Sequence, residues 1–202
     1  YNDTMTISRL AQPEPINLNP TTCVAAAGGT VTQYSSAGTN WTVHSFTSDG
    51  TFSVEVGGYV DALVVGGGGG GGAYGSTYAA AGGGGGGQVA VATQMYIPEG
   101  SYSIVVGAGG IGTPNPDFSR GTGGGMSSIG SLISAVGGGC GSSSRNYNGE
   151  DGANGGGCDG QGGSVPGRSI AGGYAGGDSS VLTAGGGGGG AGAVGSTVAS
   201  GT

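Results

Sequence analysis

The sequence predicts an all-β protein: a small antiparallel β-sandwich that continues into a polyglycine II helix bundle with irregular surface loops and essentially no α-helix. Three observations lead to this fold class. Glycine accounts for 56 of 202 residues and forms uninterrupted runs at residues 66–72, 82–87 and 185–190. The runs adjoin segments with strand-like alternation of apolar residues, and no amphipathic helix appears. Large apolar side chains are scarce, with one Trp, three Phe and three Met, so packing must rest largely on the backbone.

The glycine runs predict packed rods. Glycine is a poor former of helix and sheet interiors because it loses the most backbone freedom on ordering. In the polyproline II geometry three residues make a turn that rises about 3.1 Å per residue, so six or seven glycines form a rod of roughly 20 Å. Rods without side chains can approach closely and exchange backbone hydrogen bonds. Glycine content alone favours a flexible linker, but 7% charged and 35% hydrophobic residues favour order.

The strand patterns lie mainly in the first half of the chain. Residues 41–47 and 51–56, joined by Asp49-Gly50, predict a β-hairpin. Residues 59–65 predict a third strand that enters the first glycine run. Apolar alternation then predicts strands at 89–97 and 102–106, which reverse direction at Pro98-Glu99-Gly100, and one more apolar stretch covers 129–136.

We expect three regions along the chain. Residues 1–24 contain Pro13, Pro15 and Pro20, which bar regular helix and predict an extended arm that docks on another subunit. Residues 25–112 form a β-rich region with the first glycine runs, and residues 113–202 form a glycine-rich region with exposed loops. Because the chain begins with Tyr1 rather than methionine, we expect a fragment or a processed chain.

Charge excludes two classes of partner. The net charge is −7, the only basic residues are four Arg, and there is no Lys. Binding to a nucleic-acid backbone or to an anionic membrane requires a basic surface, which this composition cannot supply. No apolar stretch reaches the 18 residues that a membrane-spanning helix needs, so we expect no membrane insertion.

The sequence indicates no enzyme. His44 is the only histidine and lies within a predicted strand, with no Ser or Cys that can be placed beside it as a nucleophile. The many G-x-G-x-x-G matches carry no information in glycine runs, because no helix follows them. Residues 154–159 approximate a single calcium-binding nonapeptide, which chance explains in a glycine-rich chain. We expect no catalytic residue, no metal and no cofactor.

The cysteines leave one pairing open. Cys23, Cys140 and Cys158 are too few for a disulfide framework and too scattered for a zinc site. A bridge between Cys140 and Cys158 would close the longest polar loop, and the sequence leaves open whether the two are bridged or free.

Four polar loops between the glycine clusters are the candidate binding site. They span residues 73–78, 113–120, 142–151 and 164–174, and are rich in Tyr, Ser, Asn and Arg, as binding loops are. Tyr supplies contact area at low entropic cost, and Arg supplies directed hydrogen bonds. The candidate anchors are Tyr74, Tyr78, Phe118, Arg120, Arg145, Tyr147, Arg168 and Tyr174.

Four segments carry a resemblance to a family: VHSFTSDGTFSV at 43–54, VDALVVGGGGGGG at 60–72, YSIVVGAG at 102–109, and the glycine run at 184–190. In this order they look like the glycine-rich domain of bacteriophage tail proteins, especially those of marine phages. More loosely, they resemble the distal tail-fibre adhesins of T-even-type phages. The resemblance covers about residues 30–202. It implies a virion-surface, extracellular protein whose loops contact a bacterial surface protein or glycan, and which binds other virion or fibre subunits as a homo-oligomer or by attachment to a fibre.

One departure and two alternatives accompany this resemblance. The adhesins have a fibre-attachment domain before the glycine region, and residues 1–24 are too short to form one. The first alternative is a purely structural component of a virion or an extracellular filament. The second is an ice-binding protein of glycine-rich polyproline II type, which would require a strict Gly-x-x repeat that this chain lacks.

Overall fold

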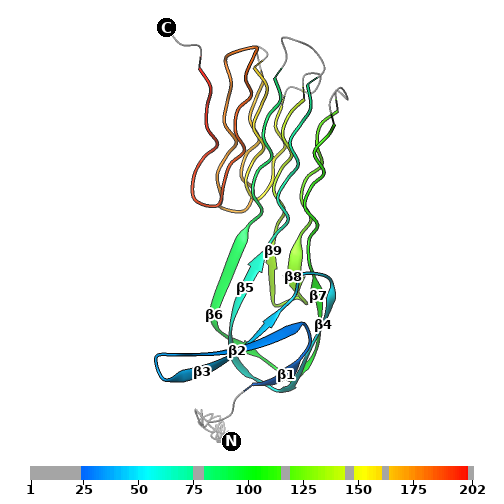
Figure 1. Ribbon diagram of the computed structural model, residues 1–202, viewed down its shortest axis with the longest axis vertical. Coiled ribbons are helices and arrows are strands. Elements are labelled where there is room, and N and C mark those ends of the chain that lie inside the picture. The colour runs from blue at the N-terminus through cyan, green and yellow to red at the C-terminus, as the bar shows by residue number, and fades with distance from the viewer. Residues whose placement is uncertain (1–23, 75–79, 115–118, 144–147, 161–163, 200–202) are drawn as a thin grey trace, which may run out of the picture.

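The computed structural model of the chain describes residues 24–74, 80–114, 119–143, 148–160 and 164–199. The molecule is elongated, with the β-strands at one end and a bundle of extended rods at the other (Figure 1). The described residues contain strands and no helix, which confirms the predicted all-β class. Accordingly, they include no helix that could span a membrane.

In the described residues, nine strands form three antiparallel sheets. Their bounds are β1 Ala25–Ala27, β2 Thr30–Ser36, β3 Thr39–Ser45, β4 Gly50–Val56, β5 Gly58–Val65, β6 Val89–Ile97, β7 Gly100–Val105, β8 Ser127–Ile129 and β9 Ile133–Ala135. One sheet has the order β1-β4-β7-β8-β9, while β2 pairs with β3 and β5 pairs with β6.

The sandwich core lies between the large sheet and the β5–β6 ribbon. Alternate residues of each strand point inward, as a period of two requires. The buried apolar side chains come from both layers, Val54 and Ile104 from the large sheet and Ala62, Val64 and Ile97 from the ribbon. The β5–β6 ribbon also contacts β8 and β9. These side chains are few and small, so this core is thin.

One predicted pairing is wrong, and one predicted turn does not join paired strands. Residues 51–56 do not pair with residues 41–47, because β4 pairs with β7 and β1. Strands β6 and β7 do not form a hairpin across Pro98-Glu99-Gly100, because β6 pairs with β5. The β6–β7 connection instead passes from one layer of the sandwich to the other, whereas the β3–β4 connection leads from the separate β2–β3 sheet into the large sheet. The inward residues of β4 and β7 thereby face those of β5 and β6, and hairpin pairing would have left them in a single layer.

The predicted strand at 41–47 belongs to a hairpin that the sequence analysis missed. Strand β3 pairs with β2 along its whole length, from Thr30 opposite Ser45 to Ser36 opposite Thr39. The turn uses Ala37 and Gly38, both with positive φ, which is the geometry of a type I′ turn. At the base of the hairpin, His44 Nδ1 donates to the Gly28 carbonyl (2.8 Å), and its ring meets Phe52 edge-on.

The predicted glycine rods are confirmed. The amides of Gly66, Gly69 and Gly72 donate to the carbonyls of Gln88, Gly85 and Gly82, at 2.9, 2.8 and 3.1 Å. The bonds recur at every third residue, which matches three residues per turn, and no glycine in these runs has a positive φ. These features together define the left-handed polyproline II geometry.

The rods form a lattice rather than a single layer. The 66–72 rod bonds through its backbone to four others, which cover residues 82–88, 107–113, 121–125 and 137–141. The 82–87 rod bonds in turn to the 185–190 rod, through Gly83 to Gly186 (3.0 Å) and Gly86 to Gly189 (2.8 Å). The three glycine runs are therefore packed together, with 82–87 between the other two.

Strands and rods interleave along the chain. Strand β5 runs into the rod at 66–72, and the rod at 82–88 returns into β6 (Figure 1). Strands β8 and β9 follow two further rods and join the same sheet as β4 and β7. Residues on both sides of the expected boundary near 112 therefore share one sheet and one lattice.

Candidate functional site

The rods define two ends, which we call the sheet end and the distal end. At the sheet end, Gly66 and Val136 both bond to Gln88, which precedes β6. At the distal end, Gly72 donates to Gly82, and Gly82 donates to Ser142. The described residues that flank segments 75–79, 115–118 and 144–147 lie toward this end, and the segments themselves lie outside the described residues. Three of the four predicted loops thus fall, at least in part, at one end of the lattice.

The eight predicted anchor residues differ in whether the structure describes them and in where they lie. Tyr74 follows Gly72 at the distal end and is about half exposed (49%). Four others lie outside the described residues: Tyr78, Phe118, Arg145 and Tyr147. The remaining three, Arg120, Arg168 and Tyr174, are among the described residues.

Arg120 belongs to a cluster within the lattice. Its side chain is half-buried, and its Nε is shielded from solvent. Its charge opposes the burial that raises the pKa of Cys140, and it adds to the hydrogen bond from Cys140 that lowers the pKa of Glu150. Glu150 Oε2 accepts from the Cys140 amide (3.2 Å), and the Glu150 amide donates to the Cys140 carbonyl (2.9 Å). This arrangement fits a residue that supports the distal end rather than one that reaches a receptor.

Arg168 and Tyr174 flank a turn that faces the sheet end. The Tyr174 amide donates to Asn154 Oδ1 (2.8 Å), and the Asn154 amide group donates to the carbonyl of Gly86 (2.8 Å), two residues before Gln88. The Arg168 amide donates to Asp151 Oδ1 (2.6 Å), and its carbonyl accepts from Gly152. The predicted fourth loop therefore begins beside the third, where the Val165 amide donates to Asn148 Oδ1 (2.9 Å), but its anchors Arg168 and Tyr174 lie toward the sheet end.

The two described cysteines are free, so the Cys140–Cys158 bridge is not formed. Each thiol is buried and has its own acidic neighbour. Burial, reinforced by a hydrogen bond to Glu150, raises the pKa of Cys140 from 9.0 to about 11. Burial also raises the pKa of Cys158, whose Sγ donates to Asp178 Oδ1 (3.1 Å). Both thiols are protonated at neutral pH, which makes them poor nucleophiles.

Asn154 has a structural role. Its side chain is 1% exposed and bonds to backbone groups on two other rods, at Gly86 and Tyr174. The sequence analysis had considered residues 154–159 only as a calcium loop. Among the described residues, no group of three His, Cys, Asp or Glu side chains could hold a metal ion.

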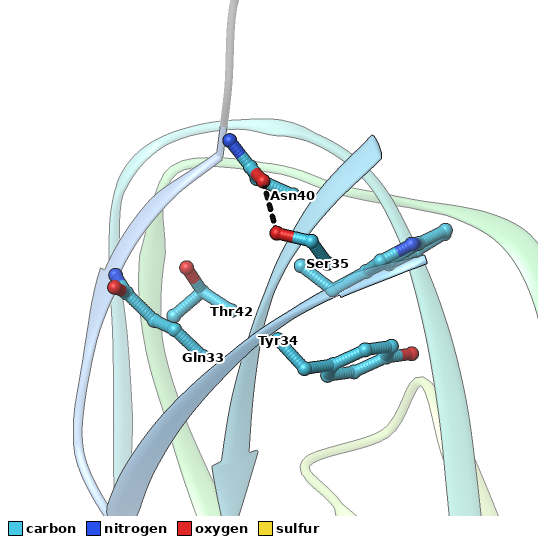
Figure 2. Close-up of a pocket in the computed structure, with 6 residues that line it drawn as sticks. Gln33, Tyr34, Ser35, Asn40 and Thr42 are labelled. Carbon is cyan, nitrogen blue, oxygen red and sulfur yellow. Dashed lines mark hydrogen bonds between the residues drawn. The ribbon is translucent and has the colours of Figure 1, made fainter. Parts of the chain in front are cut away.

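The β2–β3 hairpin carries a second candidate surface. A shallow hollow of about 350 Å³ is lined by Gln33, Tyr34, Ser35, Asn40, Trp41 and Thr42 (Figure 2). The rings of Tyr34 and Trp41 lie nearly parallel, with centroids 6.4 Å apart, and Ser35 Oγ donates to Asn40 Oδ1 (2.6 Å). Ala37-Gly38 forms the turn, and the apolar and polar residues on either side of it could have predicted this hairpin from the sequence.

Together, the fold and the rods define a class: a β-sandwich protein whose glycine segments pack as a polyglycine II lattice. A family model described as a glycine-rich domain matches residues 45–202, and the chain belongs to this family. The match begins after most of the β2–β3 hairpin and includes β4 to β9 and every rod. Comparison with curated proteins finds no match, and comparison with solved structures finds none.

Proposed function

We propose that the chain is a non-enzymatic adhesin-type protein of a phage tail, which presents the loops at its distal end to a bacterial surface protein or glycan. The observation that carries the proposal is the geometry of the lattice. Rods bonded to several neighbours hold the starts and ends of three connecting loops at one end, remote from the sheets. A rigid scaffold with variable loops at one end is a common arrangement for recognition.

The composition of these loops supports recognition rather than simple connection. They hold Tyr74, Tyr78, Phe118, Arg145 and Tyr147. Aromatic residues and Arg dominate the binding energy of protein interfaces. By contrast, the described rods consist mainly of backbone, which offers few side chains to a partner.

The test compares two variants of the purified chain for binding to the bacterium that the source phage infects. The first replaces Tyr74, Arg145 and Tyr147 by Ala at the distal end. The second, a matched control, replaces Arg168 and Tyr174 by Ala near the sheet end. We expect the first to lose about 2 kcal/mol or more, roughly thirtyfold in affinity, and the control to bind normally. Equal binding by both folded variants, or no binding by the unaltered chain, would contradict the proposal.

A purely structural role in a virion or filament is the second candidate. The observation that favours it is the unusually apolar outer face of the β5–β6 ribbon, which suits assembly with other subunits. The binding test separates the two roles, because a structural component requires no affinity for bacterial cells.

A further inference from the structure

We propose that the outer face of the β5–β6 ribbon is a self-association surface that packs against the same face of a second copy of this chain. The proposal is independent of the adhesin function. We call this surface the ribbon face, and it consists of Tyr59, Leu63, Val65, Val89, Val91 and Tyr96.

The strand register gathers these residues into one patch. Tyr59 lies opposite Tyr96, Leu63 opposite Val91, and Val65 opposite Val89. The two Tyr rings meet at 64° with centroids 5.4 Å apart. Exposed fractions run from 47% for Val89 to 67% for Leu63, so each side chain is open to solvent along much of its length. Contiguous apolar surface of several hundred Å² marks interaction sites on soluble proteins.

The opposite outer face of the sandwich is polar, so the apolar composition is specific to the ribbon face. On the β4–β7 pair, Thr51 lies opposite Ser103, and Ser53 lies opposite Ser101. All four residues carry hydroxyl groups and alternate with the inward apolar residues, as expected for a sheet face in contact with water. Only one of the two outer faces of the sandwich therefore has the composition of an interior.

Electrostatics limits which surfaces of two copies can meet. The chain carries a net charge of −7, so most surfaces of two copies repel each other. The single Asp or Glu among the outward residues of the described ribbon is Asp61, whose Oδ1 accepts from the Gln94 amide (2.8 Å). Self-association through the ribbon face therefore brings only this one carboxylate of each ribbon to the interface, where it keeps a backbone hydrogen-bond donor.

The pattern of the ribbon face is also self-complementary. Its aromatic pair lies at one end, its Val65–Val89 pair at the other, and Leu63–Val91 lies between them. A two-fold axis midway between the two end pairs, level with Ala62, would place the Tyr pair of each copy on the Val pair of the other. Standard interfaces bury roughly 800 Å² per partner, and six half-exposed side chains with their rim approach that size.

The test measures self-association by sedimentation velocity over a concentration series of the full chain. We expect a dimer for the unaltered chain and at least a tenfold weaker association for Leu63→Thr with Val91→Thr. Thr retains β-propensity at exposed strand positions, so both altered strands should persist. The matched control is Val31→Thr with Ile111→Thr, which removes exposed apolar residues outside the ribbon face and should leave the dimer unchanged.

Three outcomes would overturn the proposal. The unaltered chain could be monomeric at all concentrations, or the Leu63→Thr/Val91→Thr variant could associate normally. The chain could also become dimeric only after deletion of residues 1–22, which would make its own N-terminal segment the occupant of the ribbon face. Circular dichroism of each variant excludes misfolding as the cause. None of these measurements involves bacterial cells, so failure here and failure of the adhesin proposal are distinguishable.

Discussion

At the scale of the residue, the lattice distinguishes between glycines that look identical in the sequence. A Cβ built on Gly69 would overlap the carbonyl of Gly139, and one on Gly70 would overlap the carbonyl of Ile111. A Cβ on Gly68 or Gly71 would find its nearest atom at 3.7 Å, which is ordinary contact. Gly68 and Gly71 are one turn of the rod apart, so in this rod every third position leaves room for a Cβ.

Gly69→Ala should therefore destabilise the chain by several kcal/mol, because the methyl group meets rigid backbone on a neighbouring rod. Gly68→Ala is the matched control in the same run and should change stability by less than about 1 kcal/mol in either direction. Thermal melting of both variants checks the prediction. Equal melting temperatures would mean that the rods are not packed as described.

Asn154→Ala should cost about 1–3 kcal/mol, because it leaves the Tyr174 amide and the Gly86 carbonyl without their side-chain partner in the interior. Denaturant unfolding measures this loss. Asn154→Asp is the informative companion, since a carboxylate accepts from Tyr174 but cannot donate to Gly86. An unchanged free energy of unfolding for Asn154→Ala would show that solvent reaches this site.

Glu150 should make stability fall in acid. The hydrogen bond from the Cys140 side chain, with further help from the Cys140 amide and the charge of Arg120, lowers the pKa of Glu150 below 4.5. As pH falls below about 4.5, the unfolded chain binds the proton before the folded chain does, so the unfolding free energy decreases. Glu150→Gln should flatten this limb of the pH profile, whereas Glu99→Gln in the exposed β6–β7 turn should not.

At the scale of the element, the β2–β3 hairpin is the least supported part of the described structure. It forms a sheet of its own, and two-stranded hairpins are only marginally stable in water. Its internal support includes the Tyr34–Trp41 pair, and His44 and its contact with Phe52 tie its base to the sandwich. The hairpin should consequently open more readily than the strands of the sandwich.

Trp41→Ala should accelerate amide hydrogen exchange in residues 30–45 by up to about tenfold, since a cross-strand aromatic pair contributes about 0.5–1.5 kcal/mol. Exchange in β4 to β7 should stay unchanged. Thr42→Ala, on the other face of the same strand, is the control. Faster exchange throughout the molecule would show instead that the hairpin and the sandwich unfold together.

At the scale of the whole molecule, sandwich and lattice depend on each other because strands run directly into rods. Residues 1–22 lie outside the described residues, and the first described strand begins at Ala25. Deletion of residues 1–22 should therefore leave the melting temperature within a few degrees of the original value, while abolishing incorporation of the chain into the particle. A truncated chain that assembles normally would contradict the expected docking role of the arm.

The sequence alone identified the parts of this protein whose causes are local. Long glycine runs exclude side chains and so predict rods, and apolar alternation predicted most of the strands. Sequence also assigned Tyr74 to a segment between two glycine runs. In each case, the property follows from a residue's own backbone freedom or from the spacing of its neighbours.

Only the tertiary structure decided which segments meet. The pairing of β4 with β7 and of β5 with β6 follows from burial of Val54, Ile97 and Ile104 between two layers, which no turn signal encodes. The positions of Arg120 and Tyr174, the separation of Cys140 from Cys158 and the exposure of the ribbon face arise in the same way. The glycines of a run are chemically identical, so the sequence does not specify which rods bond to each other. The neighbours of each rod are set by the strand that it continues and by backbone bonds between distant parts of the chain.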